Sequence, residues 1–256
     1  MKVSIITVVY NAVEGIERTI RSVASQIYKD YEYIIIDGKS TDGTLDVIEK
    51  YKNNISLLIS EKDNGIYDAM NKGAKYAHGE WIVYMNAGDT FANENTLTDI
   101  FESNYNLSDA DVIYGDMRSC YISAPLIIRA KPLKTLKYRM AFCHQSSYVR
   151  SDIMRQNPFN LRYKYVADFD LFNKLYIENK LFLYIPIIMT NYYPEGGLTN
   201  NHILSVMREE NRISGIKDFK WLRHLIYTYI SFGLNRFIPL KILNKMRFLY
   251  KNAVGI

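Results

Sequence analysis

Short apolar runs without polar alternation recur along the first 90 residues, and each one ends in a polar turn. Three such runs are residues 3–8, 31–37 and 81–85. A strand with apolar side chains on both faces is buried on both, as in a parallel sheet covered by helices. Between the runs, residues 16–26 and 66–77 place apolar side chains at helical spacing. This alternation with short links predicts an α/β fold with a parallel, doubly wound sheet.

The same alternation includes a helix over 45–52 and a strand over 55–60. After residue 89 it changes, and we expect a helix over 96–102, a strand over 112–114, a hairpin or meander over 117–128, a helix over 165–179 and a strand over 181–187. Residues 191–201 read as a loop, in which Glu195-Gly196-Gly197 could close over a ligand. No repeat or linker interrupts the chain, so we expect one domain over 1–216 and an appendage over 217–256.

Polar residues gather where the expected strands end. Asp37 ends the second strand, and a glycine-rich turn over residues 38–44 follows it. Open α/β sheets bind ligands at this edge, where Asp37 could accept a hydrogen bond from a nucleobase or ribose. The alternative is an ordinary strand-to-helix turn, in which Ser40 to Thr44 cap the next helix. The turn alone does not separate these two interpretations.

Four segments taken together do so. They are residues 3–11, 37–44, 61–73 and 81–89. In this order and spacing they resemble the family 2 glycosyltransferases, inverting enzymes of the GT-A fold that use nucleotide-activated sugars. The resemblance covers roughly residues 1–200 and is closest to the bacterial branch that builds capsule, exopolysaccharide and O-antigen chains. It implies a donor-binding half over about 1–110 and an acceptor-binding half over about 111–216.

The resemblance also implies a set of donor-binding residues around the base, ribose and diphosphate. They are Thr7, Tyr10, Asn11, Asp37, Asp63, Gly65, Asn71, Lys72, Asn86, Ala87, Gly88 and His144. Several have structural alternatives. Thr7 and Tyr10 could pack at a strand end, Lys72 could form an i,i+4 ion pair with Asp68, and a lone histidine is often structural.

Residues 86–89 occupy the place of the Asp-x-Asp motif of GT-A enzymes, which holds a divalent cation. Mg²⁺ or Mn²⁺ suits carboxylate oxygens and would act as a Lewis acid on the departing diphosphate. Asn86 replaces the first acid, so Asp89 is the expected protein ligand. The alternative for Asp89 is the N-cap of a following helix.

Residues 166–171 resemble the Glu-Asp-x-x-Leu region that supplies the catalytic base in related enzymes. By that match Asp168 is the base, and Ala167 stands where those enzymes have glutamate. Asp170 is the fallback. Two residues are about 200° apart around a helix, so Asp168 and Asp170 cannot serve one site equally.

The charge is unevenly distributed. Residues 217–256 carry eight Lys or Arg and one acid, 8 − 1 = +7, so a total of +5 leaves 5 − 7 = −2 for residues 1–216. A nucleic-acid binder usually spreads a basic patch over its fold, so no nucleic-acid partner is expected. The tail is amphipathic from Pro239 and suits an anionic membrane surface. The alternative is packing on the domain or on a second copy in a homodimer.

The compartment follows from two features. The two cysteines, Cys120 and Cys143, have no metal-ligand spacing and read as reduced. Met1 leads into a strand without a visible secretory signal, which predicts a cytoplasmic protein, peripheral at the inner face of the plasma membrane.

The main hypothesis is an inverting glycosyltransferase that uses a UDP-sugar and a saccharide or polyprenyl-diphosphate-saccharide acceptor. Arg129 and Lys131 could meet an anionic acceptor. One alternative is a sugar nucleotidyltransferase, although residues 9–14 lack the glycine-rich, basic loop of that class. Another is a catalytically inactive sugar-nucleotide sensor or scaffold, which the departures at Asn86 and Ala167 favour.

Overall fold

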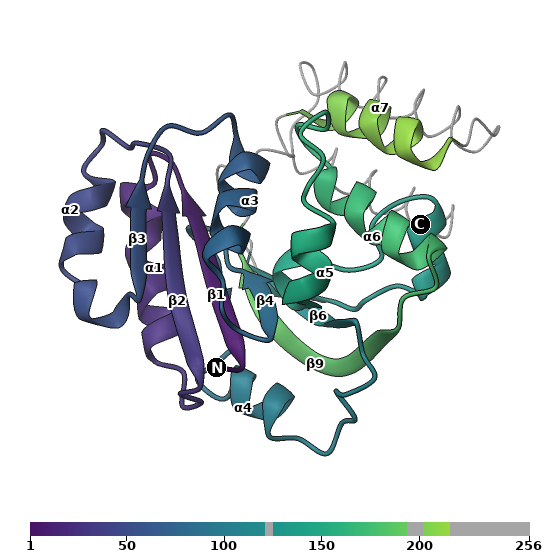
Figure 1. The fold of residues 1–256 in the computed structure, drawn as a ribbon, viewed down its shortest axis with the longest axis horizontal. Helices are drawn as coiled ribbons and strands as arrows, with labels where there is room; N and C mark the ends of the chain where they lie inside the picture. The colour runs from purple at the N-terminus through teal and green to yellow at the C-terminus, as the bar shows by residue number, and fades with distance from the viewer. Residues whose placement is uncertain (121–124, 194–201, 216–256) are drawn as a thin grey trace.

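A computed structural model of the chain describes residues 1–120, 125–193 and 202–215. The predicted loop over 195–197 and the predicted tail over 217–256 lie outside the described residues. Within the described part, the chain folds into one mixed sheet with helices on both faces (Figure 1). The α/β class predicted from the alternation of strands and helices is confirmed.

Nine described segments are strands of this sheet, in the spatial order β3-β2-β1-β4-β8-β6-β9-β5, with β7 paired to β6 beside that path. Their bounds are β1 (Val3–Val9), β2 (Tyr31–Asp37), β3 (Leu57–Ser60), β4 (Trp81–Tyr84), β5 (Thr90–Phe91), β6 (Val112–Cys120), β7 (Pro125–Ile128), β8 (Ser147–Arg150) and β9 (Phe182–Tyr192).

The helices occupy the connections between these strands. They are α1 (Val13–Ala24), α2 (Thr44–Glu49), α3 (Ile66–Tyr76), α4 (Thr96–Phe101), α5 (Ser151–Gln156), α6 (Ala167–Ile177) and α7 (Ile203–Ser214), with 3-10 turns η1 (Lys52–Asn54), η2 (Leu133–Lys137) and η3 (His144–Ser146).

The first half is the parallel part of the sheet. Strand β1 pairs in parallel with both β2 and β4, and β2 pairs in parallel with β3. All seven residues of β1 are buried, as expected for a strand with helices on both sides. Helix α1 buries Ile16, Ile20 and Val23 against one face, and α3 buries Met70 and Ala74 against the other. The carboxyl ends of β1, β2 and β4 therefore share one edge.

The second half adds antiparallel pairings. Strand β8 runs antiparallel to β4 and β6, β5 runs antiparallel to β9, and β6 is parallel to β9. The hairpin predicted over 117–128 is confirmed by the antiparallel pairing of β6 with β7. Helix α6 packs on η2 and α7, and α6 and α7 lie side by side in Figure 1.

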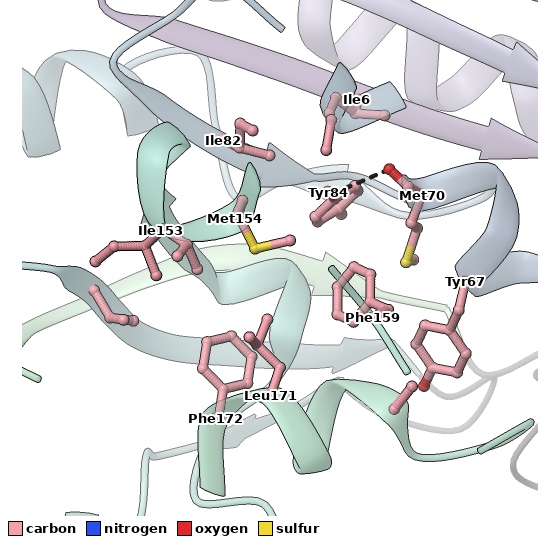
Figure 2. Packing of buried hydrophobic residues seen from close by; sticks show 14 of the residues in the cluster. Ile6, Tyr67, Met70, Ile82, Tyr84, Ile153, Met154, Phe159, Leu171 and Phe172 are labelled. Atoms are coloured by element: carbon pink, nitrogen blue, oxygen red, sulfur yellow. Dashed lines mark hydrogen bonds between the residues drawn. The ribbon is translucent and has the colours of Figure 1, made fainter. Parts of the chain in front are cut away.

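Figure 2 shows how one core joins the two halves. Phe159 lies between Tyr67 of α3 and Tyr84 of β4, with ring centroids 5.2 and 5.4 Å apart. The Tyr84 hydroxyl donates to the carbonyl of Met70 at 3.2 Å, which satisfies its polar atom inside the core. The aromatic contacts hold α3 against the loop before α6, and that loop sets the position of Asp168.

Candidate active site

A cleft of about 1330 Å³ opens at the carboxyl edge of the parallel strands. Sites for small ligands usually measure roughly 300–1,000 Å³, so this one has room for more than one substrate. Among the described residues, its lining comes from segments 8–15, 63–69, 86–89, 128–131, 140–145 and 161–168, with a few further residues. The loops after β1 and β4, the start of α3 and the start of α6 thus meet in one cleft.

Asp168 lies in the first turn of α6 and faces this cleft with 13% of its side chain exposed. Its Oδ1 accepts hydrogen bonds from the Tyr67 hydroxyl at 2.9 Å and from the amide of Phe169 at 2.9 Å. Its Oδ2 lies 3.1 Å from Nδ1 of His144. Burial works against the charged form, but the hydrogen bonds from His144 and from the Tyr67 hydroxyl outweigh it and lower the pKa of Asp168. The carboxylate is therefore held ionised.

His144 connects Asp168 to the loop after β4. Its Nε2 lies 3.2 Å from Nδ2 of Asn86. An amide nitrogen can only donate, so this contact makes Nε2 the acceptor and leaves Nδ1–H to donate to Asp168. Oδ1 of Asn86 is buried and has no hydrogen-bond partner within the described residues. Both ring nitrogens of His144 therefore have partners within the protein. The predicted contact of His144 with donor phosphate stays a prediction.

Asp89 sits deeper, with 4% of the residue exposed. Its Oδ2 accepts from the side-chain amide of Gln145 at 2.7 Å, and its Oδ1 accepts from the backbone amide of Tyr193 at 2.9 Å. Burial raises the pKa of Asp89 to about 6, although these two donors oppose the rise. Asp89 precedes strand β5 and not a helix, so the N-cap interpretation is wrong.

The donor set at residues 86–89 fits a hard divalent cation. It offers one buried carboxylate and the unpartnered Oδ1 of Asn86, both oxygen ligands of the kind that Mg²⁺ and Mn²⁺ take. No cluster of three or more His, Cys, Asp or Glu side chains that could hold a metal occurs among the described residues. Such a cation would therefore need further ligands beyond these two side chains.

One side of the cleft contains most of the other residues predicted to bind a donor. Tyr10 is 65% exposed, and Asn11 accepts the amide of Thr41 at 2.9 Å through Oδ1. Asp63 and Gly65 follow β3, where Asp63 accepts the amide of Gly65 at 2.9 Å. Gly65 has φ +115, a conformation that favours glycine. All four line the cleft, as do Asn86, Ala87 and Gly88.

Two predicted donor residues lie in the strands instead of the cleft. Thr7 is fully buried within β1, with its hydroxyl 3.0 Å from that of Tyr33. Asp37 is also fully buried, and its carboxylate accepts from the amide and hydroxyl of Ser40 and from the hydroxyl of Ser60. These bonds close the turn after β2, so the contacts favour the turn interpretation of Asp37 over a free nucleobase acceptor.

Two more lie on α3, on sides of the helix that the cleft does not reach. The side-chain amide of Asn71 donates to the carbonyl of Phe159 at 2.9 Å and accepts its amide at 2.8 Å. Lys72 pairs with Glu61 at 2.9 Å and with Asp68 at 3.7 Å. Asn71 and Lys72 make structural contacts here, including the i,i+4 contact considered from the sequence, and their role in donor binding stays a prediction.

The structure adds site residues that the sequence did not single out. Tyr67 holds Asp168 from the opposite half of the chain, and Gln145 holds Asp89. Arg18 reaches the same loop from α1, donating to the carbonyl of Gly88 at 2.8 Å and stacking 3.8 Å above the Tyr193 ring. Glu209 of α7 accepts three backbone amides just before α6, from Lys164, Tyr165 and Val166. Of these, Tyr67 lies within the segment 61–73 and Gln145 follows His144, so these two had a signal in the sequence.

The fallback base Asp170 has a different environment. Its carboxylate accepts from the side-chain amide of Asn160 at 3.2 Å, and it does not line the cleft. The separation expected between two side chains two positions apart on a helix is therefore observed. Of the two acids, Asp168 is the one that a substrate can reach.

Comparison with known proteins gives a consistent result. The family model described as Glycosyl transferase family 2 matches residues 4–162. A PGL/p-HBAD biosynthesis glycosyltransferase from Mycobacterium tuberculosis is 31% identical over 205 residues, 77% of this chain and 78% of the relative. A cholesterol galactosyltransferase from Borreliella burgdorferi is 32% identical over 114 residues, 44% of this chain and 31% of that protein.

Solved structures share the fold. S. aureus TarS 1-349 in complex with UDP-GlcNAc superposes with a TM-score of 0.65 and 18% identity, over 94% of this chain and 77% of that one. The mannosyltransferase PcManGT from Pyrobaculum calidifontis, in complex with GDP-Man and Mn²⁺, gives a TM-score of 0.62 and 15% identity, over 99% and 80%. No helix in the described part of the chain is both long and apolar enough to cross a bilayer.

Proposed function

The chain belongs to glycosyl transferase family 2, and on that premise we propose that it is an inverting enzyme that moves one sugar from a UDP-sugar to a saccharide acceptor. We propose further that the acceptor is carried on a lipid, such as a polyprenyl diphosphate, in the assembly of a bacterial surface glycolipid or polysaccharide. A relative that acts in PGL/p-HBAD biosynthesis and a structural neighbour bound to UDP-GlcNAc support these choices.

One observation carries the proposal: an ionised carboxylate and a buried oxygen-ligand site share one cleft. Asp168 is linked through His144 to Asn86, and Asn86 belongs to the same loop as Asp89. Inversion is a single in-line displacement, which needs a base on one side of the sugar and leaving-group stabilisation on the other. The chain of contacts joins groups suited to those two tasks.

The base atom can be assigned from the hydrogen bonds of Asp168. Oδ1 already accepts two, from Tyr67 and from the amide of Phe169, whereas Oδ2 has only His144 as partner. A carboxylate oxygen accepts about two hydrogen bonds, so Oδ2 retains room for the acceptor hydroxyl. The hydroxyl proton passes to Oδ2 as the acceptor oxygen bonds to the anomeric carbon and the bond from that carbon to the diphosphate oxygen breaks.

The leaving-group side would hold Mg²⁺ or Mn²⁺ through the carboxylate of Asp89 and Oδ1 of Asn86. When bound, such a cation neutralises charge on the departing diphosphate. Gln145 and the amide of Tyr193 keep the Asp89 carboxylate in one orientation. Arg18 fixes the neighbouring Gly88 carbonyl, and its guanidinium lines the cleft as a further positive group.

The test is transfer by the full-length chain with a panel of UDP-sugars, Mn²⁺ and saccharide acceptors, read as released UDP. Asp168→Asn should lower the rate by about 10²–10⁴-fold, the usual contribution of a general base, while the Kd for the donor stays within about twofold. Asp170→Asn is the matched control, because it removes a carboxylate two residues away outside the cleft. Full activity in Asp168→Asn would remove this residue from the mechanism.

A further inference from the structure

One stretch of the body, residues 117–151, is strongly basic. Residues 117–151 contain seven Lys or Arg and no Asp or Glu, a charge of +7. Residues 1–216 as a whole contain 24 bases and 26 acids, so the remainder of that range holds 24 − 7 = 17 bases and 26 acids, a charge of −9. The near-neutral total of the body therefore hides one basic segment on an acidic protein.

Not all seven bases are available to a partner. Arg118 donates to Asn191 at 2.9 Å, and Arg150 pairs with Glu80. The remaining five fall between residues 129 and 139, and three of them, Arg129, Lys134 and Lys137, are exposed. The solvent-exposed basic side chains of this stretch therefore lie within eleven consecutive residues, 129–139.

Strand β7 presents an apolar surface directly before this basic segment. Leu126, Ile127 and Ile128 are 59%, 54% and 36% exposed. Neighbouring side chains of a strand point to opposite faces, so β7 is open on both. Among the described strands, only β6 pairs with β7. Tyr138, 54% exposed, adds an aromatic ring at the other end of the segment.

The same segment leads into the cleft. Ile128, Arg129 and Lys131 line its wall, as does Met140. Leu126 and Lys137 belong to the same stretch of chain as these lining residues, so the exposed apolar and basic side chains lie on one segment that borders the cleft.

We propose that β7 and residues 129–138 dock this protein onto an anionic lipid bilayer. Apolar side chains beside lysine, arginine and tyrosine match the acyl region and the charged headgroups of such a surface. A second copy paired edge to edge through β7 fits less well, because it would place two basic segments against each other. This docking rests on the proposed function in one respect: contact with the bilayer would bring a lipid-borne acceptor close to the cleft.

The test is co-sedimentation of the full-length chain with phosphatidylcholine vesicles, with and without phosphatidylglycerol. Binding should require phosphatidylglycerol and weaken with salt. Lys134→Glu with Lys137→Glu should lower the partition coefficient about 25-fold or more, since each basic residue near an anionic surface contributes about fivefold. Leu126→Ser with Ile127→Ser should also lower the partition coefficient. Because these side chains are uncharged, the loss should be similar at high and at low salt.

Two matched controls separate this surface from general effects. Lys50→Glu with Lys52→Glu makes the same charge change on exposed residues of the first half. Ile177→Ser with Leu181→Ser removes two apolar side chains that are 66% and 58% exposed elsewhere. Both should bind vesicles like the wild type. A further variant of the full chain, Lys245→Glu with Arg247→Glu, reports on the basic tail.

Several results would overturn the proposal. They are wild-type protein that fails to bind anionic vesicles, β7 variants that bind like the wild type, and a loss of binding confined to the tail variant. Light scattering that shows a dimer lost in the β7 variants, with vesicle binding intact, would assign the surface to a second copy instead. Donor affinity and transfer to a soluble acceptor should stay unchanged in all these variants, so failure of the proposed chemistry would be seen separately.

Discussion

Replacing Asp89 with asparagine tests whether the cleft keeps a charged carboxylate at the expense of fold stability. Asp89 is almost completely buried, and burial raises its pKa to about 6 from the ordinary value of 3.8. The folded protein therefore binds this proton more tightly than the unfolded chain does. Its stabilising effect is complete below pH 3.8 and is lost as pH rises to about 6.

The size of the effect follows from the two pKa values. Their difference is about 2.2, and 1.36 kcal/mol for each pH unit gives about 3 kcal/mol of unfolding free energy. About 1.4 kcal/mol of that loss falls between about pH 5 and about pH 7.5, where most of the protein's other carboxylates do not change charge. Asp89→Asn has no ionisable group at this position and should not show this part of the loss.

The measurement is urea unfolding of wild type and Asp89→Asn at both pH values. The stability of the wild type relative to the variant should fall by about 1.4 kcal/mol from about pH 5 to about pH 7.5. Burial also raises the pKa of Glu210 to about 7, but that group titrates in both proteins and cancels. Asp46→Asn, at an exposed position of α2, controls for removal of a charge.

The same variant should lose Mn²⁺-dependent donor binding, because asparagine offers a neutral oxygen in place of the carboxylate. An equal pH dependence in wild type and Asp89→Asn would refute the reasoning, since it would mean that the carboxylate is not desolvated in the folded protein. Full retention of Mn²⁺-dependent binding would separately remove Asp89 from the cation site.

Two further predictions concern the groups around Asp168. His144→Ala should lower kcat by about 10²-fold and move the acid limb of the pH–rate profile to higher pH, because His144 is what lowers the pKa of Asp168; an unmoved limb would contradict this. The Glu209 carboxylate accepts hydrogen bonds from the amides of residues 164–166, so Glu209→Ala should speed hydrogen exchange at these amides. The variant should also lower kcat more than donor affinity. Unchanged exchange would show that α7 does not hold the loop before α6.

The sequence predicts the first half of the fold closely for a physical reason. A strand buried on both faces must be apolar throughout, and the polar turn that follows marks its exit from the core. The strand predicted over 31–37 has those bounds in the structure, and the helix predicted over 66–77 ends one residue earlier. The same argument locates the cleft, because parallel strands end at one edge.

The second half is predicted less well because its elements are short or polar. Strand β5 has two residues and β8 has four, so neither is long enough to show a strong period. Helix α7 buries one described residue, Met207, and no helix was predicted over its residues, so Glu209 was missed.

The site residues divide along a similar line. Tyr10, Asn11, Asp63, Asp89 and Asp168 follow strand ends or begin helices, and they line the cleft. Thr7 does not, because its place inside β1 directs it toward Tyr33. Which way a side chain points, and which distant partner it meets, depends on packing that a motif does not encode.

The hydroxyl of Tyr67 spans 101 positions of sequence to reach Asp168, and it also donates to the carbonyl of Tyr165 at 3.1 Å. On the proposed function, Tyr67 belongs to the half proposed to bind the donor, and Asp168 to the half proposed to bind the acceptor. Chimeras that exchange residues 111–215 between relatives to alter acceptor choice would separate these partners. An engineered hybrid should therefore inherit position 67 together with its new acceptor half.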